Sequence, residues 1–187
     1  CPEWFNWIAA VLVLVGIILF HAAGNVLSDY LDYKTGVDNK DAFCIPNLVS
    51  GEFKAADYKT YAICLFIASC LVGIILTAMS GWTLLAIGVP GLILTLLYSK
   101  SKFCALGDLN IFVIFGILPM LGTSYVTTGT IDWSTLLLSV PVGFVTVAVL
   151  HSNNTRDIPT DSAAGAHSLA YVIGEKTAVR LYEALIW

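Results

Sequence analysis

Five apolar runs, each about as long as a bilayer-spanning helix, constrain this chain more than any other feature of its sequence. A helix needs about 20 apolar residues to cross the hydrocarbon core of a membrane. The runs are continuous rather than alternating, which favours helices over the strands of a barrel. We therefore predict an all-α, multi-span transmembrane helical bundle with five full spans, followed by a truncated sixth that starts near Ser168. The five runs cover residues 5–24, 61–79, 82–98, 109–127 and 136–151.

The composition agrees with a membrane location. Of the 187 residues, 58% are hydrophobic and only 12% are charged, whereas soluble domains contain about 25% charged residues. The formal net charge of -4 therefore says little about partners in solution, and we expect a lipid bilayer and no nucleic acid. The five cysteines form no CxxC pair, which indicates neither a disulfide framework nor a zinc site.

Both ends of the sequence interrupt an apolar pattern. Cys1 stands directly before a predicted span, and Trp187 falls within an unfinished helical pattern. We therefore expect one transmembrane domain over residues 1–187 that is incomplete at both ends.

The basic residues all fall on one side of the predicted membrane. Five crossings place the loops after the first, third and fifth spans in one compartment, and the opposite loops, 80–81 and 128–134, carry only Asp132. The positive-inside rule then puts the polar loops in the cytoplasm. All nine basic residues belong to the cytoplasmic set: Lys34, Lys40, Lys54, Lys59, Lys100, Lys102, Arg156, Lys176 and Arg180.

A strongly polar stretch, HSNNTRDIPTD, directly follows the fifth apolar run at residues 151–161. Asp157 and Asp161 are four residues apart, with Pro159 between them. Because proline lacks an N–H, the pair belongs in a bent loop or in the first turn of a helix. The stretch could hold an anion through a divalent cation. Taken alone, it fits equally well a hydrophilic connection in which Asn and Asp form turns or caps.

A second acidic cluster follows the first apolar run, in the sequence NVLSDYLDYKTGVD that opens a long loop predicted over residues 25–60. Asp29 and Asp32 share a helical face. Both clusters lie on the cytoplasmic side, which is the arrangement needed to clamp two Mg²⁺ ions. Mg²⁺ prefers one or two carboxylates, with water and substrate phosphate completing its octahedron. We predict Mg²⁺ as cofactor, with these ligands: Asp29, Asp32, Asp38, Asp157 and Asp161.

A pyrophosphate bridged by Mg²⁺ to both clusters becomes a good leaving group, because its developing charge is neutralised. If the attached carbon is allylic, a carbocation forms, and the interior of a helical bundle excludes the water that would destroy it. Acidic loops and apolar spans together therefore fit the ionisation of an isoprenoid pyrophosphate.

These residues resemble the UbiA superfamily of intramembrane prenyltransferases, which have nine helices and Asp-rich motifs after the second and sixth. Ser28 to Asp32, SDYLD, looks like the first motif NDxxD, with Ser28 where the family usually has Asn. Residues 151–170 look like the second motif as found in the menaquinone-forming members. YSKSKFCALGD at 98–108 resembles the loop between the fourth and fifth helices, and residues 111–129 are also similar to the menaquinone branch. The resemblance implies that the chain covers roughly helices two to seven.

The resemblance implies transfer of a polyprenyl group from polyprenyl pyrophosphate to an aromatic acceptor, 1,4-dihydroxy-2-naphthoate, forming demethylmenaquinone. We expect an integral protein of a bacterial cell (inner) membrane. Lys102 and Asp108 match family positions, and with Asp32 and Asp157 they form the expected catalytic set. Pyrophosphate contacts are expected from Asn25, Ser28, Lys34, Asn153, Asn154 and Arg156.

Other hypotheses remain open at the level of sequence. Within the superfamily, the acceptor could be 4-hydroxybenzoate, a chlorin or a glycerol phosphate. Membrane CDP-alcohol phosphotransferases also use Asp clusters and Mg²⁺, but their DGxxAR signature is not present here. A cation transporter subunit would place ionisable groups inside the spans, where the five runs hold only His21 and His151, near their ends. We interpret both histidines as interfacial polar residues rather than proton carriers.

Overall fold

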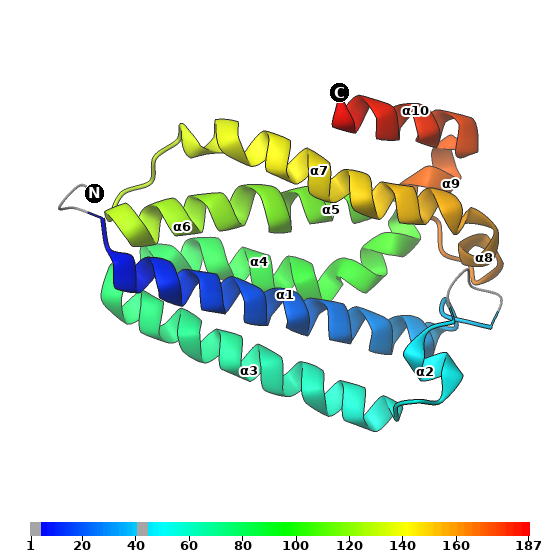
Figure 1. The fold of residues 1–187 in the computed structure, drawn as a ribbon, viewed down its shortest axis with the longest axis horizontal. Helices are drawn as coiled ribbons and strands as arrows, with labels where there is room; N and C mark the ends of the chain where they lie inside the picture. The colour runs from blue at the N-terminus through cyan, green and yellow to red at the C-terminus, as the bar shows by residue number, and fades with distance from the viewer. Residues whose placement is uncertain (1–4, 41–44) are drawn as a thin grey trace.

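The computed structural model describes residues 5–40 and 45–187. Within these ranges it describes every side chain except that of Lys102. Helices run back and forth along one long axis, as Figure 1 shows, and no strand occurs in the described part. The elements are α1 (Trp7–Thr35), α2 (Asn47–Ser50), α3 (Ala55–Ser80), α4 (Thr83–Ser101), η1 (Lys102–Cys104), α5 (Gly107–Ile111), η2 (Phe112–Ile117), α6 (Leu118–Thr128), α7 (Thr135–Arg156), α8 (Ile158–Ala163), α9 (Leu169–Ile173) and α10 (Glu175–Ile186).

Five stretches of helix have the length and apolarity to cross a membrane: α1, α3, α4, the continuous stretch from α5 to α6, and α7. Each coincides with one of the five predicted runs, so the all-α fold and the number of spans are confirmed. The helix boundaries differ from those of the apolar runs, most clearly where α1 and α7 continue past the runs to Thr35 and Arg156, because helix propensity and capping, rather than hydropathy, decide where a helix stops.

The first helix corrects the prediction of a loop beginning at residue 25. Residues 25–35, which follow the apolar run, contain neither Gly nor Pro. The helix α1 therefore continues until Gly36, which adopts a φ of 77° as the left-handed cap. A left-handed residue at this position closes many helices, and glycine has no Cβ to oppose it. The extension carries Asp29 and Asp32 on α1 instead of in a loop, and Asp38 follows the helix end.

The fourth span is interrupted by η2, a short π-helix between α5 and α6. Pro119 stands in the first turn of α6 and cannot donate a backbone hydrogen bond to the preceding turn. A π-helical turn is a common local response to such a disturbance and often occurs near functional sites. η2 is in contact with α7 and α4, and with its neighbours in sequence, α5 and α6.

The last predicted span is represented by two short helices. α9 ends at Gly174, whose φ of 78° breaks the helix, and α10 then begins at Glu175. Neither is long enough to count among the candidate spans. Figure 1 shows α10 turning back along α7, and the two helices are in contact.

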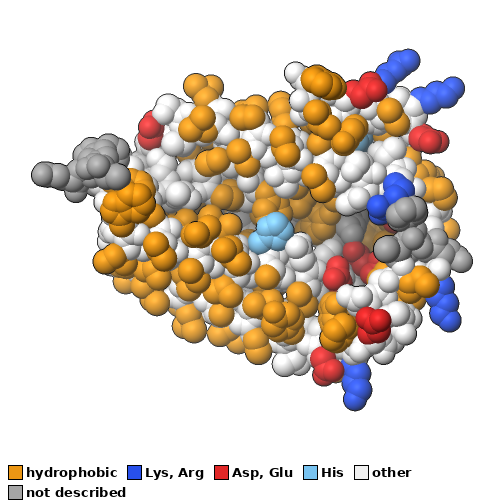
Figure 2. All heavy atoms as spheres, in the orientation of Figure 1, with side chains coloured by type: hydrophobic (Ala, Val, Ile, Leu, Met, Phe, Trp, Pro, Cys, Tyr) orange, Lys and Arg blue, Asp and Glu red, His pale blue; other side chains and the backbone are white. Residues whose placement is uncertain are grey.

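Little of the molecule forms a conventional core. The main buried apolar cluster is Ala9, Val13, Leu76 and Val126, joining α1, α3 and α6. Large apolar side chains instead cover the outside of the spans, as Figure 2 shows. This is expected where lipid is the solvent, because apolar side chains gain nothing by leaving hydrocarbon and helix packing depends on close contact between small residues.

One such contact brings η2 against α7. A Cβ placed on Gly116 would lie 2.9 Å from the Cα atom of Gly143 and 3.2 Å from the carbonyl oxygen of Ser139. These are backbone atoms, so the helices themselves would have to separate.

Gly116→Ala is therefore expected to lower the free energy of unfolding by about 1 to 3 kcal/mol, the usual cost of overpacking. Gly73→Ala in α3 is the matched control, because a Cβ there meets no atom within 4 Å. Thermal unfolding of the purified full-length variants in detergent measures the difference. Equal melting temperatures for the two variants would contradict the close-contact interpretation.

Candidate active site

The two acidic clusters lie at the same end of the bundle. In Figure 1, α1 and α7 run in the same direction and both finish at the end where α2 and α8 lie. Figure 2 shows Lys and Arg side chains, and most of the acidic ones, gathered at this end, while hydrophobic side chains cover the remainder of the visible face. Two segments more than a hundred residues apart therefore contribute polar groups to one surface.

The first cluster occupies the last turns of α1. Asp29 is exposed, whereas Asp32 is only 7% exposed. The hydroxyl of Ser28 donates to Oδ2 of Asp32 at 3.2 Å, and the backbone N–H of Asp38 donates to the carbonyl oxygen of Asp32 at 3.2 Å. Asp38 thus folds back over the helix end. Asp29 and Asp32 lie on the same helix, as predicted.

The remaining candidates from this part of the chain are more exposed. Asn25 and Lys34 are both exposed on α1, and the Lys34 ammonium lies 6.0 Å from the centre of the Tyr30 ring. Lys102 begins η1, but its side chain lies outside the part that the structure describes.

The second cluster occupies the junction of α7 and α8. Asp157 separates the two helices, and Pro159 stands in the first turn of α8, which also contains Asp161. Of the two arrangements predicted, a bent loop or a first helical turn, the structure has the second for Asp161, with Asp157 at the N-cap. The backbone N–H of Asp161 donates to the carbonyl oxygen of Asp157 at 2.8 Å.

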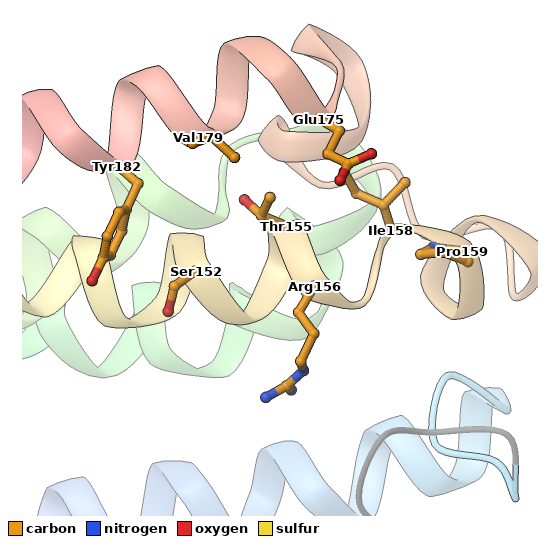
Figure 3. Close-up of a pocket in the computed structure, with 8 residues that line it drawn as sticks. All are labelled: Ser152, Thr155, Arg156, Ile158, Pro159, Glu175, Val179 and Tyr182. Carbon is orange, nitrogen blue, oxygen red and sulfur yellow. The ribbon is translucent and has the colours of Figure 1, made fainter.

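Arg156 forms a two-pronged ion pair with its neighbour. Its Nε donates to Oδ1 of Asp157 at 2.7 Å, and its Nη2 donates to Oδ2 at 2.5 Å. The side chains are 46% and 27% exposed, so water and ions reach both. Figure 3 shows Arg156 projecting from α7 toward α1. Positive charge thus lies between the two acidic clusters, where an anion would bind.

Asp108, on α5, is held by side chains of α7. It is 6% exposed, and His151 is fully buried. His151 Nδ1 lies 2.5 Å from Oδ2 of Asp108, and Asn154 Nδ2 donates to Oδ1 of Asp108 at 3.5 Å. Both oxygens of the carboxylate therefore contact protein groups. This arrangement favours a positioning role for Asp108 over direct contact with substrate.

The interpretation of His151 as an interfacial residue is wrong, because its ring is enclosed by α5, α7 and α10. Its Nε2 lies 3.1 Å from the carbonyl oxygen of Ala178. A carbonyl can only accept, so Nε2 carries a hydrogen. The pair with Asp108 is then net neutral, as imidazolium and carboxylate or as imidazole and carboxylic acid. Sequence reasoning could have asked which group neutralises the acidic residue of ALGD, since a carboxylate beside apolar helices needs a partner.

The asparagines of the second motif differ in their surroundings. Asn153 is exposed, while Asn154 is half-buried beside Asp108. Because Asn154 donates through its amide nitrogen to the carboxylate, its amide oxygen is directed away from Asp108. That orientation leaves an acceptor oxygen for a cation rather than a donor for a phosphate.

The chemistry of this surface suits Mg²⁺. Among residues 5–40 and 45–187, no three His, Cys, Asp or Glu side chains converge on one point, so the protein alone does not enclose an ion. A site that uses one or two carboxylates and leaves places for water and phosphate is what Mg²⁺ commonly takes. Asp29, Asp32, Asp157 and Asp161 are of the right type for such a site.

A cavity of about 390 Å³ lies on another side of α7. Figure 3 shows its lining residues on α7, α8 and α10, with Thr155 directed toward α10 and the guanidinium of Arg156 extending away from it. The hydroxyls of Ser152 and Thr155 donate to carbonyl oxygens of their own helix, Val149 and His151. Because Arg156 is one of the lining residues, the cavity adjoins the second acidic cluster.

Comparison with known proteins supplies relatives from animals. The UbiA prenyltransferase domain-containing protein 1 homolog of Drosophila melanogaster is 32% identical over 191 residues, which cover 99% of this chain and 53% of that protein. The protein of this name from Gallus gallus is 33% identical over 179 residues (92% and 54%). The Homo sapiens protein is 31% identical over 179 residues (92% and 53%).

The chain thus spans about half the length of the curated relatives that it matches. These relatives do not support the expected bacterial membrane, and their names do not specify a menaquinone-forming enzyme. The prediction of a UbiA-type bundle with several apolar spans is nevertheless matched at the level of the family. The sequence model of the UbiA prenyltransferase family matches the chain from residue 1 to residue 187, and the chain belongs to that family.

Proposed function

We propose that this chain forms the pyrophosphate-binding part of a magnesium-dependent enzyme that transfers a polyprenyl group from polyprenyl pyrophosphate to an aromatic acceptor. The observation that carries the proposal is the presence of both acidic clusters, with Arg156 beside the second, at one end of an apolar bundle. The bundle supplies a dry compartment for the isoprenoid tail, and the polar end supplies groups for the head.

The expected roles divide between cation and anion. Asp29, Asp32, Asp38, Asp157 and Asp161 would hold Mg²⁺ through carboxylate oxygens. Mg²⁺ would supply charge to the bridging oxygens of the pyrophosphate, so that the bond to the allylic carbon breaks more readily. Asn25, Ser28, Lys34 and Asn153 would contact the same head group, and the amide oxygen of Asn154 suits the cation better than the phosphate.

The ion pair between Arg156 and Asp157 suggests how the site changes on binding. A carboxylate held by two N–H groups is less available to a metal, so a cation at Asp157 would displace the guanidinium. Arg156 would then turn its guanidinium to the pyrophosphate, in the two-pronged geometry that such pairs usually adopt. Both side chains are partly exposed, so the exchange needs no rearrangement of a helix.

For the acceptor we propose 1,4-dihydroxy-2-naphthoate, with loss of its carboxyl group and formation of demethylmenaquinone. The support is the likeness of residues 111–129 and 151–170 to the naphthoate-using branch. The distribution of Lys and Arg supports a cytoplasmic orientation of the site. An assay of the full-length protein with prenyl pyrophosphate, Mg²⁺ and either the naphthoate or 4-hydroxybenzoate tests the proposal. Transfer only to 4-hydroxybenzoate would overturn the acceptor.

Lys102 is the proposed partner of the acceptor carboxylate. Lys102→Met is expected to remove about 1.5 to 3 kcal/mol of transition-state stabilisation, the value of one charged hydrogen bond. This corresponds to a roughly 10- to 150-fold fall in kcat/KM for the naphthoate. Binding of prenyl pyrophosphate with Mg²⁺ should change much less. Lys100→Met is the control, because Lys100 is an exposed neighbour at the end of α4. Equal activity of the two variants would show that Lys102 only anchors the helix end.

A further inference from the structure

One face of α1 carries a stripe of side chains that runs from the acidic end into the span. Asp32, Ser28, Asn25 and His21 are separated by four, three and four residues, so they share this face. Farther from the acidic end, the same spacing reaches Ile17 and Leu14. At 1.5 Å per residue, the distance along the helix from Asp32 to His21 is about 16 Å.

This stripe is not the face that packs on the neighbouring helix. The side of α1 that meets α3 is marked by Gly16, where a Cβ would lie 3.1 Å from Val72, and by Phe20, whose ring centre is 5.8 Å from that of Phe66. On the stripe, Leu14 is 59% exposed and Ile17 is 36% exposed. His21 and Asn25 are exposed as well.

The stripe changes from polar to apolar at His21. A prenyl pyrophosphate changes in the same way, from a charged head to a hydrocarbon tail, and the carbon that reacts is the one that joins them. If the head binds among Asp32, Ser28 and Asn25, then the reacting carbon lies about one helical turn deeper, close to the level of His21.

The His21 ring is directed toward the fourth span. It lies 4.7 Å, centre to centre, from the ring of Phe115 on the π-helix η2, at a tilt of 55°. His21 therefore stands at the side of α1 that faces the chain segment following Asp108. An ionisable group inside a span is costly and usually has a function. An aromatic neighbour is also suited to the ring of an aromatic acceptor.

We propose that His21 is a catalytic residue that binds a hydroxyl group of the acceptor and takes its proton as the new carbon–carbon bond forms. The inference rests on the proposed function. The hydroxyl proton moves to the imidazole, the ring carbon bonds to the allylic carbon, and the bond between that carbon and the pyrophosphate oxygen breaks with its electron pair leaving on pyrophosphate. The ring carbon then loses carbon dioxide, or a proton that passes to the released pyrophosphate, and imidazolium returns its proton to the ring oxygen.

The test compares full-length wild type with His21→Phe, which keeps a ring against Phe115 but removes the base, and with His21→Gln. His167→Gln is the control, because His167 is exposed and stacks on Tyr171 outside the spans. The assays use the acceptor that wild type accepts, together with fluorine-substituted forms of it whose hydroxyl groups are progressively more acidic.

His21→Phe is expected to lower kcat/KM for the unsubstituted acceptor by a factor on the order of 100, within the usual range for a general base. The ratio of wild-type to variant rate should shrink as the hydroxyl becomes more acidic, because such acceptors need less help to ionise. The KM for prenyl pyrophosphate should stay within about threefold of wild type, and the His167 variant should behave as wild type.

Two results would overturn the assignment of His21. One is a wild-type rate in His21→Phe; the other is a rate lowered equally for every acceptor, which indicates a packing role. If wild type itself transfers no prenyl group to any acceptor, the proposed function fails, and that outcome is recognised before any variant is compared.

Discussion

Asp32→Asn and Asp157→Asn, each in the full-length protein, are expected to abolish detectable prenyl transfer while leaving membrane insertion intact. Each change removes one charge that would hold Mg²⁺ against the pyrophosphate. Electrostatic groups of this kind contribute about 10²- to 10³-fold each to rate, and loss of a metal ligand also weakens metal binding. Activity over a range of Mg²⁺ concentrations, with protein amount measured in the membrane fraction, gives the result.

Asp132→Asn provides the matched control for these two variants. Asp132 lies in the loop between α6 and α7, at the end of the bundle opposite the acidic surface. Hydrogen bonds from the side chain and the backbone of Ser134 hold its pKa below the usual value, so it is charged at neutral pH. Loss of this charge should leave transfer unchanged. Near wild-type turnover in Asp32→Asn or Asp157→Asn at saturating Mg²⁺ would refute the two-cluster clamp.

His151→Ala is expected to produce the largest loss of stability among single changes in the bundle. It would leave Asp108, at 6% exposure, without its closest partner, and breaking one side of a buried pair costs about 3 to 5 kcal/mol. For a chain of this size, a loss of about 3 kcal/mol corresponds to a fall in melting temperature of roughly 6 to 12 °C. Thermal unfolding in detergent measures it, with His167→Ala as the exposed control.

The double variant Asp108→Asn, His151→Ala identifies the cause of that loss. If an unpaired carboxylate is responsible, neutralising it should recover part of the stability. The sum of the losses in the two single variants, Asp108→Asn and His151→Ala, will then exceed the loss in the double variant. Strict additivity of the losses would mean that the histidine ring contributes only by packing. His151 Nε2 lies within hydrogen-bond distance of the carbonyl oxygen of Ala178 on α10. Loss of this hydrogen bond between α7 and α10 should also weaken the packing of α10.

These predictions separate two parts of one polar end. The exposed part, with Asp157 and Arg156, is expected to carry the chemistry. The buried part, with Asp108 and His151, ties α5, α7 and α10 together beneath it. Variants of the exposed part should lose activity without losing stability. Variants of the buried part should lose stability first, and should lose activity only as Asn154 and its helix shift.

The family likeness and the chemistry of the acidic residues were both accessible from sequence. Pro159, between Asp157 and Asp161, limited the prediction to a bent loop or a first helical turn because proline lacks an N–H, and the structure decided between the two. The five spans followed from apolar length alone, since the bilayer fixes how long a helix must be. The extent of α1 beyond the apolar run was missed, because hydropathy marks where lipid ends and says nothing about where backbone hydrogen bonding ends.

Partners distant in sequence were not accessible. His151 and Asp108 are 43 residues apart, and the carbonyl oxygen of Ala178 lies 27 residues farther along the chain than His151. Nothing local to any of the three predicts that they meet, since the meeting depends on how α5, α7 and α10 pack. The π-helix that brings Phe115 opposite His21 also arises from a disturbance that hydropathy does not register.

The sequence by itself determined the membrane environment, the number of spans and the end of the bundle at which the acidic groups gather. These properties follow from run length and from the alternation of crossings, neither of which requires knowledge of packing. Only the tertiary structure decided which polar groups remain open to a ligand and which are used within the protein. That distinction depends on the neighbours that packing brings to each side chain.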